Sequence, residues 1–262
     1  MHKTTALNLQ TVNYLRDLLY ELVNRDMKLR YKRSALGIVW SLLNPLAQLL
    51  VFTFVFGVVL PLDIPNYPLF VFTGLLVWNW FQSALFQASD CIVANPDLIR
   101  RPGFPVPVLP VVTITTHLIH FLLAVPILLG FLVWSQSPMT TALLFFPVLI
   151  ILQFLLILSL SYVMAALQVI FRDMQYLLGI ILTLTFFMTP IFYDASAIPE
   201  TYRVIYALNP VVQLVTAYRA MFLYGQIPNL LPLLIIGLAS LSLLYVSYTI
   251  FIQTSYRFVE EL

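Results

Sequence analysis

Charged residues are scarce in this chain of 262 residues. They make up 9% of the sequence, whereas hydrophobic residues make up 61% and the mean hydropathy is +0.95. Soluble domains carry about 25% charged residues. The scarcity of charge therefore argues strongly against a water-soluble globular fold and indicates an integral membrane protein.

Cysteine and the common catalytic motifs are also scarce or missing. Cys91 is the single cysteine, so neither a disulfide framework nor a cysteine-based metal cluster can form. None of the eight glycines is followed by lysine, which excludes a Walker-type loop for ATP phosphates. The acidic residues form neither a His-Glu-x-x-His motif nor a paired-carboxylate motif. We therefore expect no catalytic residue, no metal site and no cofactor held by this chain itself.

The chain contains long apolar runs. A helix needs about 20 apolar residues to cross a bilayer. The runs predict six transmembrane helices, at 36–60, 69–89, 107–133, 142–170, 176–192 and 230–252. No low-complexity linker divides them, so residues 1–262 are predicted to form one all-α integral membrane domain. With six spans, eleven of the thirteen basic residues fall on the side of both termini. Since positive charge collects in the cytoplasm, both termini are predicted to be cytoplasmic.

An amphipathic helix is predicted at 7–33, ahead of the first span. Its apolar residues recur at helical spacing, and Glu21 and Arg25 are placed to pair on the opposite face. Such a helix lies in the headgroup region of a membrane. It acts either as a plain anchor or also as a surface for a cytosolic partner. The apolar face comprises Val12, Leu15, Leu18, Leu19, Leu22 and Val23.

The segment 193–229, before the last span, predicts a re-entrant helical hairpin. Pro199–Leu208 and Val211–Tyr224 can form two helices separated by Asn209-Pro210, and Gly225 can end the second. At roughly 15 and 21 Å, both are shorter than the apolar core of a bilayer, yet both carry apolar residues that need burial. The hairpin is either a gate over the outer exit or an interfacial cap.

Polar side chains within the predicted spans form two small groups. His117 and His120 share a face of the third span, where hydrogen bonding between helices is favoured over a proton relay or a metal pair. Ser83, Gln87 and Asp90 line one face at the end of the second span. They border a hydrated passage at the cytoplasmic mouth or pair with a neighbouring helix.

Aromatic residues are abundant, at 15% of the chain. Phe186, Phe187, Phe192 and Tyr193 approach the outer end of the fifth span, where their rings could line an exit for a neutral, sugar-like cargo. Packing against lipid explains any single phenylalanine better, and only the combination of many aromatic residues with few fixed charges favours such a cargo.

Several short motifs follow one another along the chain. They are Arg25-Asp26-Met27-Lys28-Leu29-Arg30-Tyr31-Lys32, Ser34-Ala35-Leu36-Gly37 with Trp40, Asn44-Pro45, Asn95-Pro96-Asp97-Leu98-Ile99-Arg100-Arg101, Phe171-Arg172-Asp173 and Leu208-Asn209-Pro210. In this order they resemble the membrane subunit of type-2 ABC exporters of polysaccharide, the group that serves O-antigen, capsule and teichoic acid. The resemblance covers essentially the whole chain.

The resemblance implies a set of partners in the bacterial inner membrane. Two copies of this chain would pair with two ATP-binding cassette subunits, which bind ATP and magnesium, and would move an undecaprenyl-diphosphate-linked glycan. Nucleic acid is not an expected partner. Asn95, Pro96, Asp97, Leu98, Ile99, Arg100 and Arg101 would form a coupling helix that docks into the ATPase, and Phe171, Arg172 and Asp173 a second contact.

The basic cluster Arg25, Lys28, Arg30, Lys32 and Arg33 has two interpretations. It anchors the chain to anionic lipid, or it recognises the diphosphate of the lipid-linked glycan through charge-assisted hydrogen bonds.

Three alternative functions stay open. One is an ABC exporter of a small lipid or drug, because aromatic linings also suit apolar cargo. Another is a self-contained proton-coupled flippase that uses His117 and Asp90. The third is a membrane enzyme acting on lipid-linked sugar, although no acid–base cluster supports it.

Overall fold

A computed structural model describes residues 9–32, 34, 37, 39–138, 140–256 and 258, and the residues so described form helices and no strands. Five helical segments in this part of the chain are long and apolar enough to cross a membrane. They are α2 (Val39–Phe54) continued by a π-helix (Val55–Val59), α3 (Tyr67–Asp90), α5 (Val108–Trp134), a 3₁₀ turn (Thr141–Phe145) continued by α6 (Phe146–Ile170), and α10 (Leu230–Ser255). All five agree with predicted spans to within a few residues.

The remaining predicted span, 176–192, is shorter than expected. Its helix, α7, covers Met174–Met188, and its 15 residues reach roughly 22 Å. Thr189 is extended because it precedes Pro190, and a residue before proline is disfavoured in the helical region. The predicted helix therefore ends four residues early, and crossing by α7 stays a prediction.

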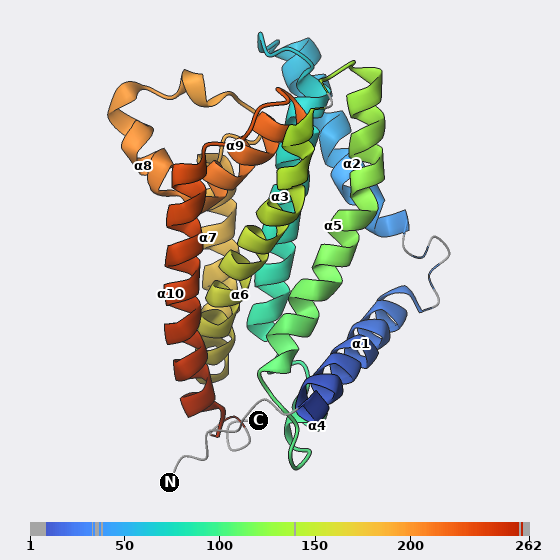
Figure 1. Ribbon diagram of the computed structural model, residues 1–262, viewed down its shortest axis with the longest axis vertical. Helices are drawn as coiled ribbons and strands as arrows, with labels where there is room; N and C mark the ends of the chain where they lie inside the picture. Colours follow the sequence, from blue (N-terminus) through green and yellow to red (C-terminus); the bar gives the residue numbers. More distant parts are fainter. Residues whose placement is uncertain are drawn as a thin grey trace.

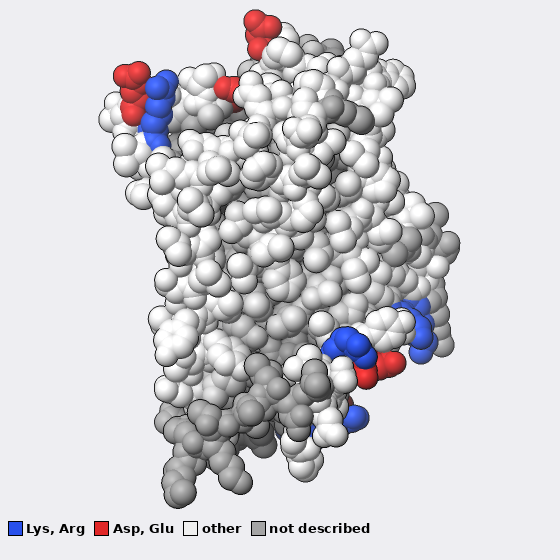
Figure 2. Space-filling view, viewed as in Figure 1, with Lys and Arg blue, Asp and Glu red and all other residues white. Residues whose placement is uncertain are grey.

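Helix α3 is the centre of the bundle (Figure 1). It packs against α2, α5, α6, α7 and α9, and α10 packs along α6. Trp78, Phe70 and Phe72 of α3 are almost completely buried. On the face drawn in Figure 2, charged side chains of the described residues lie toward the two ends, with an uncharged band between them. This distribution suits a bundle whose middle is surrounded by lipid tails.

Helix α1 (Leu9–Tyr31) lies beside the lower half of α5, close to the short helix α4 (Pro96–Ile99) (Figure 1). Leu22 and Val23 are buried against Val112 of α5, with Leu18 and Leu19 beside them. Part of the predicted apolar face of this helix therefore packs on protein. Residues 7, 8 and 33 of the predicted helix lie outside the described residues, and its placement in a headgroup region stays a prediction.

Two helices of unequal burial occupy the predicted hairpin. Helix α8 (Arg203–Leu208) is exposed, and its Val204 and Leu208 are 68% and 78% accessible, contrary to the burial expected of them. Helix α9 (Pro210–Phe222) is buried against α3 and α6. Asn209 begins α9 by accepting a hydrogen bond from the Val211 amide at 3.0 Å. The predicted break at Asn209-Pro210 is confirmed; re-entry of the hairpin into a membrane stays a prediction.

Arg219 of α9 is buried at 5% exposure, and main-chain carbonyls surround its guanidinium. It donates to the carbonyl oxygens of Pro190 at 2.6 Å, Ile191 at 2.7 Å and Phe70 at 3.3 Å. Its Cζ also lies 3.4 Å from the centre of the Phe70 ring. One side chain thus joins α9 both to α3 and to the turn after α7.

We predict that Arg219→Met destabilises the protein by roughly 3 kcal/mol, because the change leaves three buried carbonyls without their donor. Arg203→Met is the matched control, since Arg203 lies in the same hairpin with a 55% exposed side chain. It should change the stability by less than about 1 kcal/mol. Thermal unfolding in detergent compares the two variants, and equal unfolding temperatures would contradict a stabilising role for Arg219.

Gly225, just after α9, is fixed by a close approach of two loops. Its φ is +59°, and a Cβ there would lie 2.9 Å from the Pro138 carbonyl oxygen. Thr140 also donates its hydroxyl to the Gly225 carbonyl oxygen at 2.6 Å. The loop before the 3₁₀ turn and the end of the hairpin are therefore held together without room for a side chain.

Gly225→Ala should destabilise the protein by about 1–3 kcal/mol, because alanine is strained at this φ and meets the Pro138 carbonyl. Gly130→Ala in α5 is the control, as a Cβ there meets nothing within 4 Å. It should be neutral or stabilise by up to about 1 kcal/mol. If both variants unfold at the wild-type temperature, the close approach at Gly225 has no energetic consequence.

Candidate functional site

Helix α4 forms the tip of the predicted coupling segment, directly after α3. Asn95 precedes it, and Asn95 Nδ2 donates to the Cys91 carbonyl oxygen at 2.9 Å, which fixes the turn. Ile99 is buried and Leu98 partly buried, so one face of α4 packs on the bundle. Asp97, Arg100 and Arg101 are exposed on the other side. A short helix with a buried apolar face and an exposed charged face can receive another protein.

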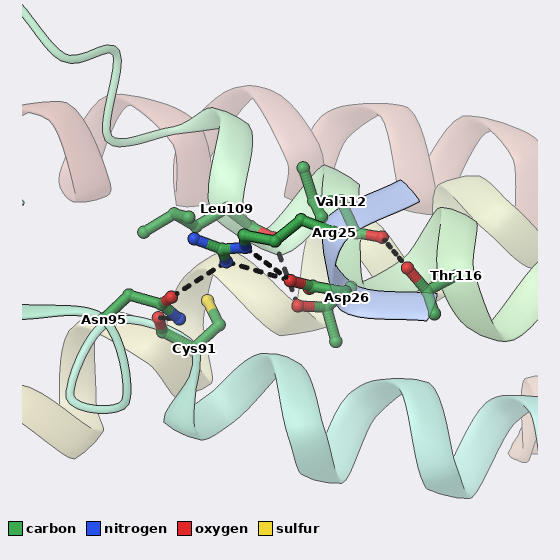
Figure 3. A network of polar contacts seen from close by, with 8 residues as sticks. Arg25, Asp26, Cys91, Asn95, Leu109, Val112 and Thr116 are labelled. Atoms are coloured by element: carbon green, nitrogen blue, oxygen red, sulfur yellow. Dashed lines mark hydrogen bonds and ion pairs between the residues drawn. The ribbon is translucent and has the colours of Figure 1, made fainter. Parts of the chain in front are cut away.

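Arg25 links α1 to this segment (Figure 3). Its Nη2 donates to Asn95 Oδ1 at 3.1 Å and to Asp26 Oδ1 at 2.9 Å. The predicted pair of Arg25 with Glu21 is wrong, because the guanidinium turns toward Asp26 and Asn95. The bond to Asn95 crosses 70 positions of sequence, so no helical spacing could have indicated it. Helices α1 and α4 are therefore joined by this polar contact, and Leu98 of α4 also packs against the group around Leu22 and Val23.

The second predicted contact, Phe171 with Arg172 and Asp173, lies in the turn between α6 and α7. All three residues are exposed, and Gln168 Nε2 donates to the Arg172 carbonyl oxygen at 3.2 Å. The Phe171 side chain is 57% accessible although it is apolar. An exposed aromatic residue beside two charges suits a protein contact, but nothing in the described residues shows its partner.

The basic residues of α1 do not form one cluster. Arg25, Lys28 and Lys32 border one groove, whereas Arg30 lies roughly 140° around the helix from Arg25 and lines a cavity on another side. Arg33 lies outside the described residues. The predicted recognition group is thus divided between two faces of α1.

The cavity beside Arg30 lies between α1, α2, α3 and α5 and has a volume of about 390 Å³. Both predicted histidines line it, as do Ser83 and Gln87 of α3. The Tyr31 hydroxyl lies 3.3 Å from His120 Nδ1, so the expected hydrogen bond between helices is present at His120. Asp90 lines the neighbouring cavity, which shares Arg30 and Gln87 with the first.

The predicted exit aromatics do gather in one cluster at the end of α7. The Phe192 ring stacks on Phe52 and Phe56 of the first span, each at 5.4 Å between centroids. Phe186 contacts Trp78 of α3 at 5.6 Å, and Phe187 and Tyr193 complete the group. The Tyr67 hydroxyl holds the Phe192 carbonyl oxygen at 2.9 Å. The arrangement can line a path or seal it, since several of the rings are only partly buried.

With this geometry in view, comparison with known proteins is informative. The ABC-2 type transporter family matches residues 17–223, from α1 to the end of α9. The chain belongs to this family. The match includes α4, the turn after α6 and the aromatic cluster, so the candidate sites all lie within the family's shared region.

Among relatives of this ABC-2 transporter chain, the O-antigen export system permease protein RfbA of Myxococcus xanthus is 38% identical over 94% of this chain and 96% of its own length. RfbA of Klebsiella pneumoniae is 33% identical over 96% and 97%. The polysialic acid transport protein KpsM of Escherichia coli is 26% identical over 87% and 89%. The similarity extends over nearly the full length of each relative.

Two polar contacts between helices of this ABC-2 chain were not predicted from the sequence. Tyr31 was assigned no role, although it bridges α1 to His120 of α5. Asn79 donates to Gln48 Oε1 at 3.0 Å and so joins α3 to α2 within the apolar bundle. A polar residue in an apolar run was the available signal for Asn79; nothing near Tyr31 distinguished it.

We predict that Arg25→Ala and Asn95→Ala are energetically coupled by about 1 kcal/mol, because each removes the same charged hydrogen bond. Thermal unfolding of both single variants and the double variant measures the coupling. Arg16→Ala with Asn95→Ala is the control pair, since Arg16 lies roughly 13 Å earlier along α1 and bonds to Asp17. Additive effects in both pairs would contradict a stabilising link between α1 and α4.

Proposed function

We propose that this chain is the membrane subunit of an ATP-driven exporter that carries a lipid-linked, O-antigen-like polysaccharide across the bacterial inner membrane. The observation that carries the proposal is the 38% identity, over nearly both full lengths, to a permease named for O-antigen export. The absence of a Walker-type loop from the sequence agrees with a division of labour in which separate subunits bind ATP and magnesium.

In the proposed assembly, two copies of this chain form the path and two ATP-binding subunits act on α4. The exposed Asp97, Arg100 and Arg101 would contact the ATPase, while the buried Ile99 transmits force to the bundle. Phe171, Arg172 and Asp173 would form the second contact. Both segments and both termini would then face the cytoplasm, as the distribution of basic residues predicts.

The aromatic cluster suits a neutral glycan. Phe186, Phe187, Phe192 and Tyr193 offer ring faces on which sugar C–H groups can stack, without fixed charges that would hold the cargo. The lipid carrier of the glycan would be an undecaprenyl diphosphate, recognised by the basic residues of α1. Arg25 is already engaged by Asp26 and Asn95, and Lys28 and Lys32 border a different groove from Arg30, so Arg30 is the better single contact for the diphosphate.

Affinity purification of the chain from its native membrane tests the proposal. Recovery of a stoichiometric ATP-binding subunit, whose ATPase activity depends on this chain, would support it. Recovery of an ATP-independent protein that transports along a proton gradient would instead support a self-contained flippase. A complex that stimulates ATP hydrolysis with a small lipid or drug, but not with glycan, would identify another ABC cargo.

Arg100→Glu tests the coupling segment, because it reverses a charge on the exposed side of α4. We expect loss of the ATPase on purification, or at least about a tenfold fall in ATP-dependent export, as like charges across an interface are strongly unfavourable. Arg203→Glu on α8 makes the same change in a segment that the proposal keeps away from the ATPase. Copurification and export that are unchanged in Arg100→Glu would remove α4 from the interface.

A further inference from the structure

Several polar side chains line the cavity between α1, α2, α3 and α5, in an otherwise apolar part of the molecule. Arg30 and Tyr31 line it from α1, Gln87 from α3, and His117 and His120 from α5. Its volume of about 390 Å³ falls within the range of small-molecule sites. Packing between helices alone would not need a space of this size with this lining.

His117 gives the cavity an unfilled hydrogen-bonding group. Its side chain is 5% exposed, and its Nε2 has no partner among the described residues. A buried polar atom without a partner is destabilising, so native proteins usually supply one from protein, water or ligand. His120 beside it lies 5.8 Å away between ring centroids and faces the Tyr31 hydroxyl. Two imidazoles therefore face one space, one of them unpartnered.

The charge of the side chains that line the cavity favours an anionic ligand. Arg30 is the charged side chain among the described residues of the lining, and no described Asp or Glu lines this cavity. The adjoining cavity, which shares Arg30 and Gln87, continues to Asp90, Asn95 and the start of the coupling segment. Polar side chains therefore line two neighbouring cavities, one beside the start of the coupling segment and one beside the histidines.

The position of the cavity favours a lipid as the ligand. One wall is the amphipathic helix α1 and the others are helices long enough to cross a membrane. Trp40, at the start of α2, is exposed and lies in the same lining, and tryptophan favours the level of lipid headgroups. An amphiphile can place its headgroup in this space while its chain stays in the bilayer.

We propose that this cavity binds the phosphate-bearing headgroup of a membrane lipid. Arg30 supplies the positive charge, and His117 Nε2, as an N–H, donates a hydrogen bond to a phosphate oxygen. His120 and Tyr31 close the site from α5 and α1. The identity of the lipid rests on the proposed function: for a glycan exporter it is the polyprenyl diphosphate of the cargo, and otherwise it is a phospholipid of the surrounding membrane.

Lipid retention by the full-length chain with its ATPase partner tests the site. The protein is placed in phosphatidylcholine nanodiscs that contain either undecaprenyl diphosphate or phosphatidylglycerol, washed in detergent, and its retained lipid is counted by mass spectrometry. Arg30→Gln and His117→Phe should each lower retention at least about tenfold, because each removes a hydrogen bond to a charged group. Arg16→Gln removes the same charge from an exposed part of α1 and should retain the wild-type amount.

Each outcome has one meaning for the site. Retention of undecaprenyl diphosphate that depends on Arg30 supports a cargo headgroup; retention of phosphatidylglycerol with the same dependence supports a bound phospholipid. Wild-type retention of both lipids by Arg30→Gln would overturn the proposal, as would an equal loss in Arg16→Gln. Arg30 is exposed on its helix, so this variant stays informative even if His117→Phe does not fold. Absence of an ATPase from the wild-type preparation would overturn the proposed function, while lipid retention by the full chain would still be measurable.

Discussion

The guanidinium of Arg219 holds together parts of the chain that are far apart in sequence. A charge buried in an apolar bundle needs compensation, and here three main-chain carbonyls accept hydrogen bonds from the guanidinium. The carbonyls of Pro190 and Ile191 are available because α7 ends at Met188. The Phe70 carbonyl lies in the first turn of α3 and can accept a hydrogen bond from Arg219 as well as one within the helix. The early end of α7 thus leaves free the carbonyls that compensate the buried charge of Arg219.

The surroundings of Arg219 follow from this arrangement. A Cβ on Gly74 would lie 2.9 Å from Arg219 Nη2, so α3 needs a glycine where the guanidinium passes. Holding Ile191 also fixes the next residue, Phe192, whose ring stacks on the first span and whose carbonyl accepts from Tyr67. The aromatic cluster at this end of the bundle is therefore positioned by a cation that lies outside it.

Sequence periodicity and length predicted the elements better than the contacts between them. Five spans, the break at Asn209 and the helix before the first span follow from apolar runs, proline and capping, which act over a few residues. The end of α7 was missed because apolar residues continue beyond Pro190, and run length was given more weight than the pre-proline restriction. The burial of Arg219 could not be predicted from the sequence, because burial of a cation depends here on carbonyls from α3 and from the turn after α7. The division of the basic cluster between two faces of α1 follows from helical geometry and could have been predicted.

Helix α3 connects the two ends of the molecule. It is one uninterrupted helix of 24 residues, about 36 Å long, and α4 follows it after a single turn. Its first turn carries the Phe70 carbonyl that Arg219 holds, and its last half lines the polar cavity with Gln87. A buried helix packed on five neighbours transmits displacement with little bending. In the proposed assembly, a force on α4 would therefore act along an element that also holds α9.

Helix α1 is attached to the bundle more loosely than α3 is. Its two polar contacts join it to different parts of the bundle. Arg25 bonds to Asn95 beside α4, whereas Tyr31, less than two turns later, bonds to His120 at the cavity. Between them Arg30 lines the cavity, and its side chain forms no hydrogen bond with another described residue. Elements with few buried contacts are those that move at the lowest free energy, and only a small group around Leu22 and Val23 buries α1. In the proposed assembly, docking of a partner at α4 and occupancy of the cavity would therefore both act on α1, because this helix contacts both places.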